Sequence, residues 1–389
     1  IVWAYRGQIV PETARLSIDL ELLERASDAR GRFAVASASL WADDTRIYQV
    51  SRVGLRIVEP ALVPAVGEAP PPLVRDDRRV DLDRLRRFWS GRTGLTGWLI
   101  EDLILAMIRQ FVGRLHLPAN PLPRGALLLA NHETAVESLL LCPIYGALTG
   151  EHAVALSKAE HRSSWIGGLM TAAQAHPGAT VPTLLAFFDR GDRAALPGLL
   201  ERLADEVLRR GQSLLVHVEG TRARSCRHRP AKLGSAVLEL ALRHRLPIVP
   251  VRFTGGLPVA PAPAALDFPI GHGAQDIHFG ATIHPEQLAG LPHARRAALV
   301  LAAIAGLGPA IERSEPCAPD PALSADITRR TREAGLNPIA ATLLAVLHRC
   351  PDPSPETRAL LRGDGSQLPP DQRAWLAAVQ ERLALQSRG

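Results

Sequence analysis

Two short polar motifs contain the residues of this chain best suited to chemistry. The first, NHETAVE, begins at Asn131 and places His132 five residues before Glu137. The second, VEGTRAR, begins at Val218 and holds a Gly-Thr-Arg turn. A carboxylate that accepts from one imidazole nitrogen leaves the other free to act as a base. A glycine turn beside an arginine offers backbone donors and a planar cation, which suit a phosphate. Together the motifs predict a general base beside an anion-binding turn.

Both motifs begin where an apolar run ends. Such runs, at residues 126–130 and 213–218, are typical of buried strands, and open α/β sheets place their sites at strand ends. Further strands are predicted at 153–157, 184–188, 248–253 and 277–283, and helices at 134–148, 193–210 and 232–243. This alternation predicts a layered α/β domain with a largely parallel sheet.

Five sequence blocks in order give residues 81–315 a family resemblance. They are His132-x4-Glu137, Ser157-Lys158-Ala159-Glu160 running to Trp165-Ile166-Gly167-Gly168, Phe187-Phe188-Asp189-Arg190-Gly191, His217-Val218-Glu219-Gly220-Thr221-Arg222, and Pro247-Ile248-Val249-Pro250-Val251. The segment resembles the glycerolipid acyltransferase family, whose best-known members make phosphatidate from lysophosphatidate. Three departures stand out: Glu137 where the family has aspartate, and Val218 and Trp165 where it has proline.

The resemblance assigns roles to the motif residues. His132 and Glu137 are the predicted catalytic pair. The predicted substrate-binding residues are Asn131, Lys158, Arg190, Glu219, Gly220, Thr221 and Arg222. The arginine and the turn would hold a phosphate, Glu219 a glycerol hydroxyl, and Arg190 and Lys158 would close the same pocket. An ordinary turn with solvated cations is the alternative for the anion site.

Residues 1–60 have a different character. Residues 33–41 and 45–50 predict two strands joined by the turn Ala42-Asp43-Asp44. Together with Trp3-Ala4-Tyr5-Arg6-Gly7 the segment resembles the end of a hotdog dehydratase domain, like those of bacterial polyunsaturated fatty-acid synthases. That resemblance implies a fragment of a longer synthase. A dehydratase needs a histidine base, and none precedes His116, so we expect a scaffold remnant. A free-standing β cap is the alternative.

The remaining segments complete the predicted organisation. Residues 61–80 contain a proline cluster and are predicted to be a semi-rigid linker. Apolar residues from Ile100 to Leu115 recur at helical spacing, downstream of an arginine- and tryptophan-rich stretch. That helix either packs on the core or lies in a membrane interface, and the resemblance favours the membrane. Residues 316–389 predict a helical tail whose role the sequence leaves open, with docking on the acyltransferase domain or on a neighbouring module as the alternatives.

Composition narrows the partners. The chain has 389 residues and a formal net charge of +6, which suits an anionic membrane or an acidic carrier protein; aromatic residues make up only 4%, so nucleic acid is not expected. Its four cysteines form no CxxC pair, which implies neither a zinc site nor a disulfide framework and favours a reducing cytoplasm. The two lysines, Lys158 and Lys232, both fall in family-like blocks among many arginines.

These observations define the predicted function. We expect an O-acyltransferase that moves a long-chain, polyunsaturated acyl group from an acyl carrier protein (phosphopantetheine) or CoA thioester to lysophosphatidate, with no bound cofactor or metal. The other expected partners are the inner face of the membrane, on which the protein would be peripheral, and synthase modules. Two alternatives remain: a thioester hydrolase, which would use water as acceptor, and a non-catalytic docking domain in which Glu137 marks decay.

Overall fold

The computed structural model describes residues 3–5, 9–28, 31–57, 73–189 and 195–385. The chain divides into two compact units, Ile1–Ala69 and Pro70–Gly389. Most of the predicted linker, residues 61–72, lies outside the described residues, so its stiffness stays a prediction.

The first unit is an antiparallel sheet. Its strands are β1 (Trp3–Tyr5), β2 (Leu16–Asp28), β3 (Gly31–Ala42) and β4 (Thr45–Ile57), in the order β1-β4-β3-β2. The predicted hairpin is confirmed, since β3 and β4 pair around a turn in which Asp43 takes a positive φ of 52°. The Asp43 carboxylate also accepts from the backbone N–H of Arg15 at 2.8 Å, which ties the start of β2 to the turn.

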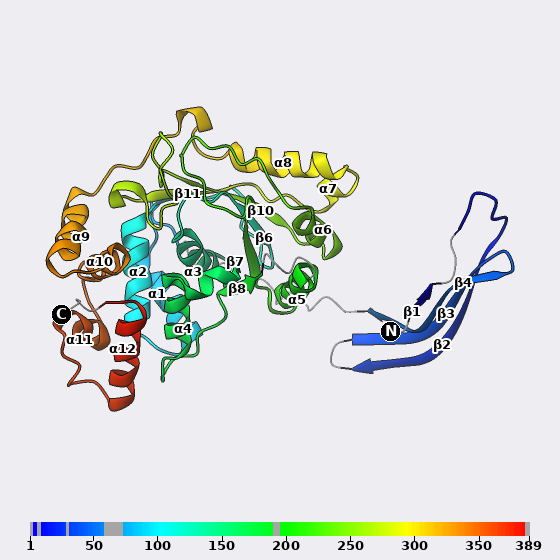
Figure 1. Ribbon diagram of the computed structural model, residues 1–389, viewed down its shortest axis with the longest axis horizontal. Helices are drawn as coiled ribbons and strands as arrows, with labels where there is room; N and C mark the ends of the chain where they lie inside the picture. The colour runs from blue at the N-terminus through cyan, green and yellow to red at the C-terminus, as the bar shows by residue number, and fades with distance from the viewer. Residues whose placement is uncertain (1–2, 6–8, 29–30, 58–72, 190–194, 386–389) are drawn as a thin grey trace. The chain divides into compact units, whose positions relative to one another are not determined.

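The second unit contains the predicted mixed α/β fold, built on a seven-stranded sheet (Figure 1). Its order is β5-β11-β10-β6-β9-β7-β8, and β11 pairs antiparallel with β10 while the central strands run parallel. The strands are β5 (Val112–His116), β6 (Leu127–Ala130), β7 (Ala153–Lys158), β8 (Leu185–Phe188), β9 (Ser213–His217), β10 (Ile248–Thr254) and β11 (Gln275–Phe279).

Helices cover both faces of this sheet. Alternate residues of β6 point to opposite faces: Leu128 joins the larger hydrophobic cluster and Leu127 the smaller. The larger cluster includes residues of α1 (Leu82–Thr93), α2 (Leu99–Phe111), α3 (Glu137–Thr149), α4 (Trp165–Gln174), α9 (Pro321–Glu333), α10 (Pro338–Leu347), α11 (Pro355–Arg362) and α12 (Pro370–Arg382). The smaller includes residues of α5 (Ala195–Arg210), α6 (Ser235–Arg243), α7 (Glu286–Ala289) and α8 (His293–Ala305).

The expected membrane-interface helix is a core element, so that preference was wrong. Helix α2 ends at Phe111, and the chain continues as the edge strand β5 rather than as helix to Leu115. Its apolar residues are buried, and so are two of its acidic residues, Glu101 and Asp102. The prediction of a membrane-interface helix was wrong because the polar side of α2 packs against other parts of the protein. Among the described helices, none is long and apolar enough to cross a membrane.

The C-terminal tail supplies partners for Asp102, while Glu101 accepts from Ser90 of α1 and from the Gly97 N–H. Asp102 accepts from the Ser354 N–H at 2.7 Å and from the Thr357 hydroxyl at 2.7 Å, at the start of α11. Glu356 accepts from the backbone N–H of Leu99 at 3.0 Å and contacts His176 at 2.7 Å. The tail is therefore docked on the acyltransferase-like domain, where it completes the core around α2.

Candidate active site

The pairing of β6 with β9 brings the two motifs together at the carboxyl ends of these two central strands. Ala130 pairs in parallel with His217, so the residues that follow both strands emerge side by side. His132 follows β6, and Glu137 is the first residue of α3. The Nδ1 atom of His132 lies 3.0 Å from Oε2 of Glu137. The structure thus brings the predicted catalytic pair into contact and leaves Nε2 of His132 outside that contact.

Glu137 is held by several donors. It accepts from the backbone N–H of Glu133 at 3.0 Å, from the backbone N–H of Thr134 at 2.9 Å and from Nε2 of Gln275 at 2.9 Å. The carboxylate is only 1% exposed. Burial raises the pKa of Glu137 to about 7, and these hydrogen bonds oppose that rise. So many donors are best satisfied by an ionised carboxylate.

A second buried carboxylate, that of Glu133, shares the Gln275 amide with Glu137. It accepts from Gln275 Nε2 at 3.2 Å and from the Gly256 N–H at 2.7 Å. Burial first, and then the neighbouring Glu137 charge, raise the pKa of Glu133 to about 8. Because Glu137 accepts from more donors than Glu133 does, the negative charge of this pair is better stabilised on Glu137. Glu137 is left to act as the charged partner of His132.

Cationic groups surround the base. Burial, followed by the charges of Arg222, His161 and Lys158, lowers the pKa of His132 to about 3. His132 is therefore neutral at physiological pH, as a general base must be. The same positive surroundings favour an anionic substrate. His161 lies in the short 3-10 helix Ala159–Ser163 directly after Lys158, which ends β7.

The Gly-Thr-Arg turn lies at the end of β9. Gly220 takes a positive φ of 63°, which suits glycine, and its N–H donates to the His217 carbonyl. Arg222 donates to the Leu266 carbonyl at 2.7 Å and to Asp267 at 2.9 Å, so it is oriented by the loop before Phe268. The Thr221 side chain is exposed, and its hydroxyl donates a weak 3.4 Å hydrogen bond to the carbonyl oxygen of Arg222.

Two other predicted binding residues have protein partners. Glu219 lies 2.8 Å from Nε2 of His228. The Asn131 amide donates to and accepts from the backbone of Phe253, at 2.9 and 2.8 Å, and so locks β6 to β10. Their contacts with substrate stay predictions, as do those of Lys158. Arg190 lies outside the described residues.

Sequence reasoning missed three residues of this site: Glu133, Gln275 and His217. The ring of His217 stacks on that of His132, with centroids 3.7 Å apart and an interplanar angle of 18°. Glu133 lies inside the first motif and His217 directly precedes the second, and what distinguishes both is that they are buried polar residues. Gln275 could not be recognised from the sequence as a site residue, because it reaches the site only when β11 pairs with β10.

Two groups of side chains have the size and composition of a metal site. They are His132, Glu137 and His217, and His116, Asp276 and His278 on β5 and β11. In each group the two imidazoles are stacked, with interplanar angles of 18° and 11°. A metal lies in the plane of each ligating ring at about 2.0–2.1 Å, which two parallel rings cannot both satisfy. The geometry therefore does not suit a metal in either group.

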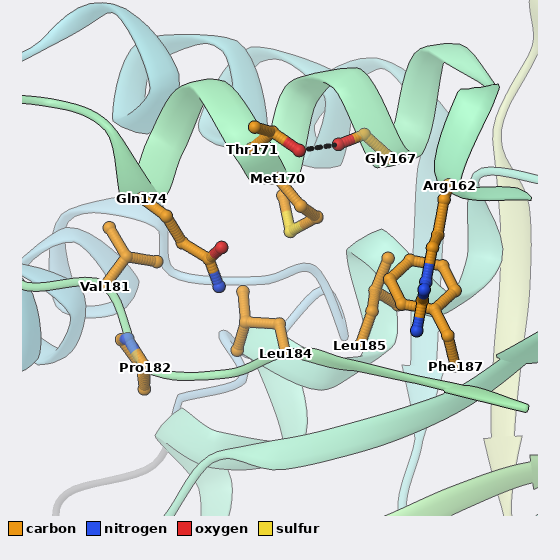
Figure 2. A pocket seen from close by; sticks show the side chains of 10 residues that line it. All are labelled: Arg162, Gly167, Met170, Thr171, Gln174, Val181, Pro182, Leu184, Leu185 and Phe187. Carbon is orange, nitrogen blue, oxygen red and sulfur yellow. Dashed lines mark hydrogen bonds between the residues drawn. The ribbon is translucent and has the colours of Figure 1, made fainter. Parts of the chain in front are cut away.

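A pocket of about 250 Å³ opens between α4 and the segment that leads into β8 (Figure 2). Met170, Val181 and Leu184 form its apolar wall, and these three also line a small apolar crevice beside α1 and α2. The Arg162 guanidinium lies over the Phe187 ring at 5.2 Å on one side of the pocket. Since Arg162 adjoins His161, this wall is next to the cationic surroundings of His132.

Comparison with known proteins agrees with this geometry. Residues 112–254, from β5 through β10, match the family model named Acyltransferase, and residues 1–51 match the model named FabA-like domain. Residues 112–254 are thus similar to the Acyltransferase family, and residues 1–51 are similar to FabA-like domains. A "Probable 1-acyl-sn-glycerol-3-phosphate acyltransferase" of Mycoplasma pneumoniae (strain ATCC 29342 / M129 / Subtype 1) is 26% identical over 141 residues, 36% of this chain and 48% of that protein. The chain thus spans about half the length of this relative.

Proposed function

We propose that this protein is an O-acyltransferase that moves a long-chain acyl group from a thioester to the free hydroxyl of lysophosphatidate, giving phosphatidate. The observation that carries the proposal is the 3.0 Å contact between His132 Nδ1 and the buried, multiply hydrogen-bonded Glu137. The family of the domain and the printed name of the Mycoplasma relative support the same reaction class.

The reaction needs no covalent intermediate. The ionised Glu137 accepts a hydrogen bond from the Nδ1–H group of His132, so the lone pair is on Nε2. Nε2 takes the proton of the acceptor hydroxyl as its oxygen attacks the thioester carbonyl. The carbon–oxygen bond forms, the carbon–sulfur bond breaks, and the thiolate leaves with the proton from the imidazolium. Such base assistance contributes about 10²- to 10⁴-fold to the rate.

The cations around His132 fit a phosphate-bearing acceptor. Arg222 and Lys158 both act electrostatically on His132, while burial and these two charges lower the pKa of the neighbouring His161 and keep it neutral. Arg222 is already oriented by Asp267, which lowers the cost of ordering it when the acceptor binds. A thioester hydrolase could use this cationic region only for the phosphates of its donor, because its acceptor, water, carries no phosphate.

The pocket beside α4 is our candidate for the acyl chain. Its wall of Met170, Val181 and Leu184 is apolar, and its volume of about 250 Å³ is below the ~300–1,000 Å³ typical of whole ligand sites. It therefore suits a segment of a chain rather than an entire donor. We assign the acyl chain to this pocket. The phosphate of the acceptor is assigned to the region of Arg222 and Lys158, beside the short 3-10 helix Ala159–Ser163.

The FabA-like segment favours an acyl carrier protein over CoA as the donor, because it implies a synthase that holds its chains on carriers. On that basis we propose a polyunsaturated acyl group, neighbouring synthase modules as partners, and a peripheral position on the inner face of the membrane that contains the acceptor.

The test is an acyl-transfer assay on the purified chain. Long-chain acyl-carrier-protein or acyl-CoA thioester is supplied with and without lysophosphatidate, and mass spectrometry scores phosphatidate and free acid. We expect phosphatidate that requires both the acceptor and His132, with His132→Ala as the control. Free acid alone would replace the proposal with the hydrolase. The absence of both products from every donor and lysolipid tried would leave a docking role.

A further inference from the structure

The ring of His217 forms a buried platform beneath the base. His217 ends β9, and its imidazole lies face to face with that of His132 at 3.7 Å between centroids. The residue is only 9% exposed. Phe253 approaches the ring from β10 at 6.2 Å. His132 therefore has protein on one face of its ring and Glu137 at its edge, which leaves few directions in which it can turn.

Both nitrogens of His217 are committed to residues that flank the catalytic pair. Nδ1 lies 2.7 Å from the carbonyl oxygen of Asn131, to which it donates. Nε2 lies 2.9 Å from the hydroxyl of Ser138, from which it accepts. Asn131 precedes His132, and Ser138 follows Glu137. One ring thus joins the end of β6 to the start of α3, and its two hydrogen bonds fix a neutral tautomer.

We propose that His217 is a positioning residue that fixes the ring plane of His132, so that Nδ1 faces Glu137 and Nε2 faces the acceptor. The proposal rests on the proposed function, because it names what orients that base. An aromatic face supplies the stack, and the hydrogen bonds to Asn131 and Ser138 set its angle. Loss of alignment in a base of this kind costs far more in turnover than in substrate binding.

A catalytic Ser138–His217 pair is a different assignment of the same contacts, and the electrostatics oppose it. Burial, followed by the neighbouring His132, lowers the pKa of His217 to about 3. That shift is shared with His132, but Nδ1 of His217 is bonded to the neutral Asn131 carbonyl, whereas Nδ1 of His132 is bonded to the Glu137 carboxylate, which can stabilise an imidazolium. Around the two rings, the charged or titratable groups are Glu137 on α3, Arg222 after β9, and Lys158 and His161 at the end of β7. Ser138 is therefore assigned as a hydrogen-bond donor.

Two variants separate the stack from the hydrogen bonds. His217→Phe keeps an aromatic face and loses both hydrogen bonds, whereas His217→Ala loses both features. For His217→Ala we expect kcat to fall about 10²-fold with KM for thioester and lysophosphatidate almost unchanged, and His217→Phe should recover much of the loss. The matched control is His152→Ala. It removes a buried histidine that contacts Gln212 at the amino ends of β7 and β9, opposite the site, and it should leave kcat unchanged.

A readout without substrate keeps the inference separate from the proposed function. In the wild-type protein the Nδ1 proton of His132 should give a low-field, slowly exchanging NMR resonance, because it is bonded to buried Glu137. His217→Ala should broaden or abolish this resonance, and His217→Phe should retain it. If the wild-type protein transfers no acyl group but the resonance behaves in this way, the proposed function fails and the platform stands.

Two results would overturn the platform. One is a His217→Ala protein that keeps both its kcat and the resonance. The other is an acyl adduct on Ser138, found by intact-mass analysis after incubation with acyl thioester and absent from Ser138→Ala, because it would make His217 the base of a serine nucleophile.

Discussion

Glu137 reaches His132 from the first turn of α3 with one methylene more than an aspartate would have. Its carboxylate is fixed by backbone N–H groups of Glu133 and Thr134 and by Gln275, so the longer side chain is not left mobile. The replacement of the family's aspartate is therefore compensated by local hydrogen bonds, and we interpret it as a working variant rather than as decay.

Replacement of Glu137 by glutamine should lower kcat by about 10²- to 10⁴-fold, because the amide can donate to Nδ1 and stabilise the wrong tautomer of His132. The measurement is steady-state transfer to lysophosphatidate. The matched control is Glu133→Gln, which replaces the neighbouring buried carboxyl, bonded to Gly256 and Gln275, and should keep most of the activity. Equal losses in the two variants would show that the pair acts only structurally.

The acidic limb of the pH profile should report Glu137. Burial raises its pKa to about 7, so the ionised form needed for catalysis is lost as the pH falls through 7, and kcat falls with it. Gln275→Leu removes a donor that stabilises the ionised form, so the pKa rises further and the limb moves to higher pH. The control is Gln212→Leu, a buried glutamine at the amino end of β9, opposite the site. A limb that stays in place in Gln275→Leu would assign the ionisation to another group.

At the scale of elements, the central strands were predictable because each is a short apolar run. The strands β6, β9 and β10 were found within a residue or two of their ends. Strand β5 was missed because Val112 and Leu115 continue the helical spacing of α2, and local spacing does not show that β11 pairs there. The burial of α2 could not be predicted from the sequence either, because its Asp102 accepts a hydrogen bond from Ser354, which lies 252 residues further along the chain.

The same limit applies to the site. Residues close in sequence, such as His132 and Glu137, are recognisable as a pair from their spacing on a strand end and a helix start. Gln275, which joins the two buried carboxylates, lies 138 residues from Glu137. Its contribution depends on strand order, which one sequence does not reveal. The stacked position of His217 likewise follows from the register of β6 against β9.

The contact between α2 and the tail should contribute substantially to stability. Asp102→Ala leaves the Ser354 N–H and the Thr357 hydroxyl without their buried acceptor, at a cost of about 1–3 kcal/mol for each unsatisfied group. Urea unfolding followed by circular dichroism measures the loss. Asp352→Ala, an exposed acid in the same loop, should change the free energy of unfolding by less than about 0.5 kcal/mol. Similar values for the two variants would mean that the tail is not coupled to α2.

Helix α4 should set the length of acyl chain that is transferred. Met170→Trp places a larger ring in the pocket wall, so long chains should lose kcat/KM relative to short ones. The assay compares a series of acyl thioesters at fixed lysophosphatidate. The control is Met107→Leu, a buried methionine of α2 outside the pocket lining. A uniform loss across all chain lengths would place the acyl chain elsewhere.

At the scale of the whole molecule, chemistry and core both belong to the second unit. All described residues of the candidate site lie between Asn131 and Gln275, and the two hydrophobic clusters that cover its sheet begin at Leu73. The first unit has a sheet of its own, with Ile18 and Leu20 of β2 exposed. Its described residues contain no histidine and so supply no imidazole base, and we propose that this unit recruits the donor.

This division predicts the behaviour of a chain that starts at Pro70. Because the described residues of the cores around the large sheet all lie from Leu73 onward, residues 70–389 should fold cooperatively and keep the kcat of the full chain with acyl-CoA. With acyl carrier protein as donor, KM should rise in the shortened chain, since the carrier would have lost its docking unit while the base is unchanged. Thermal unfolding and donor-dependent kinetics on both chains make the comparison. A loss of kcat with both donors would show that the first unit supports the site directly, and equal KM values for the carrier would remove its role in recruitment.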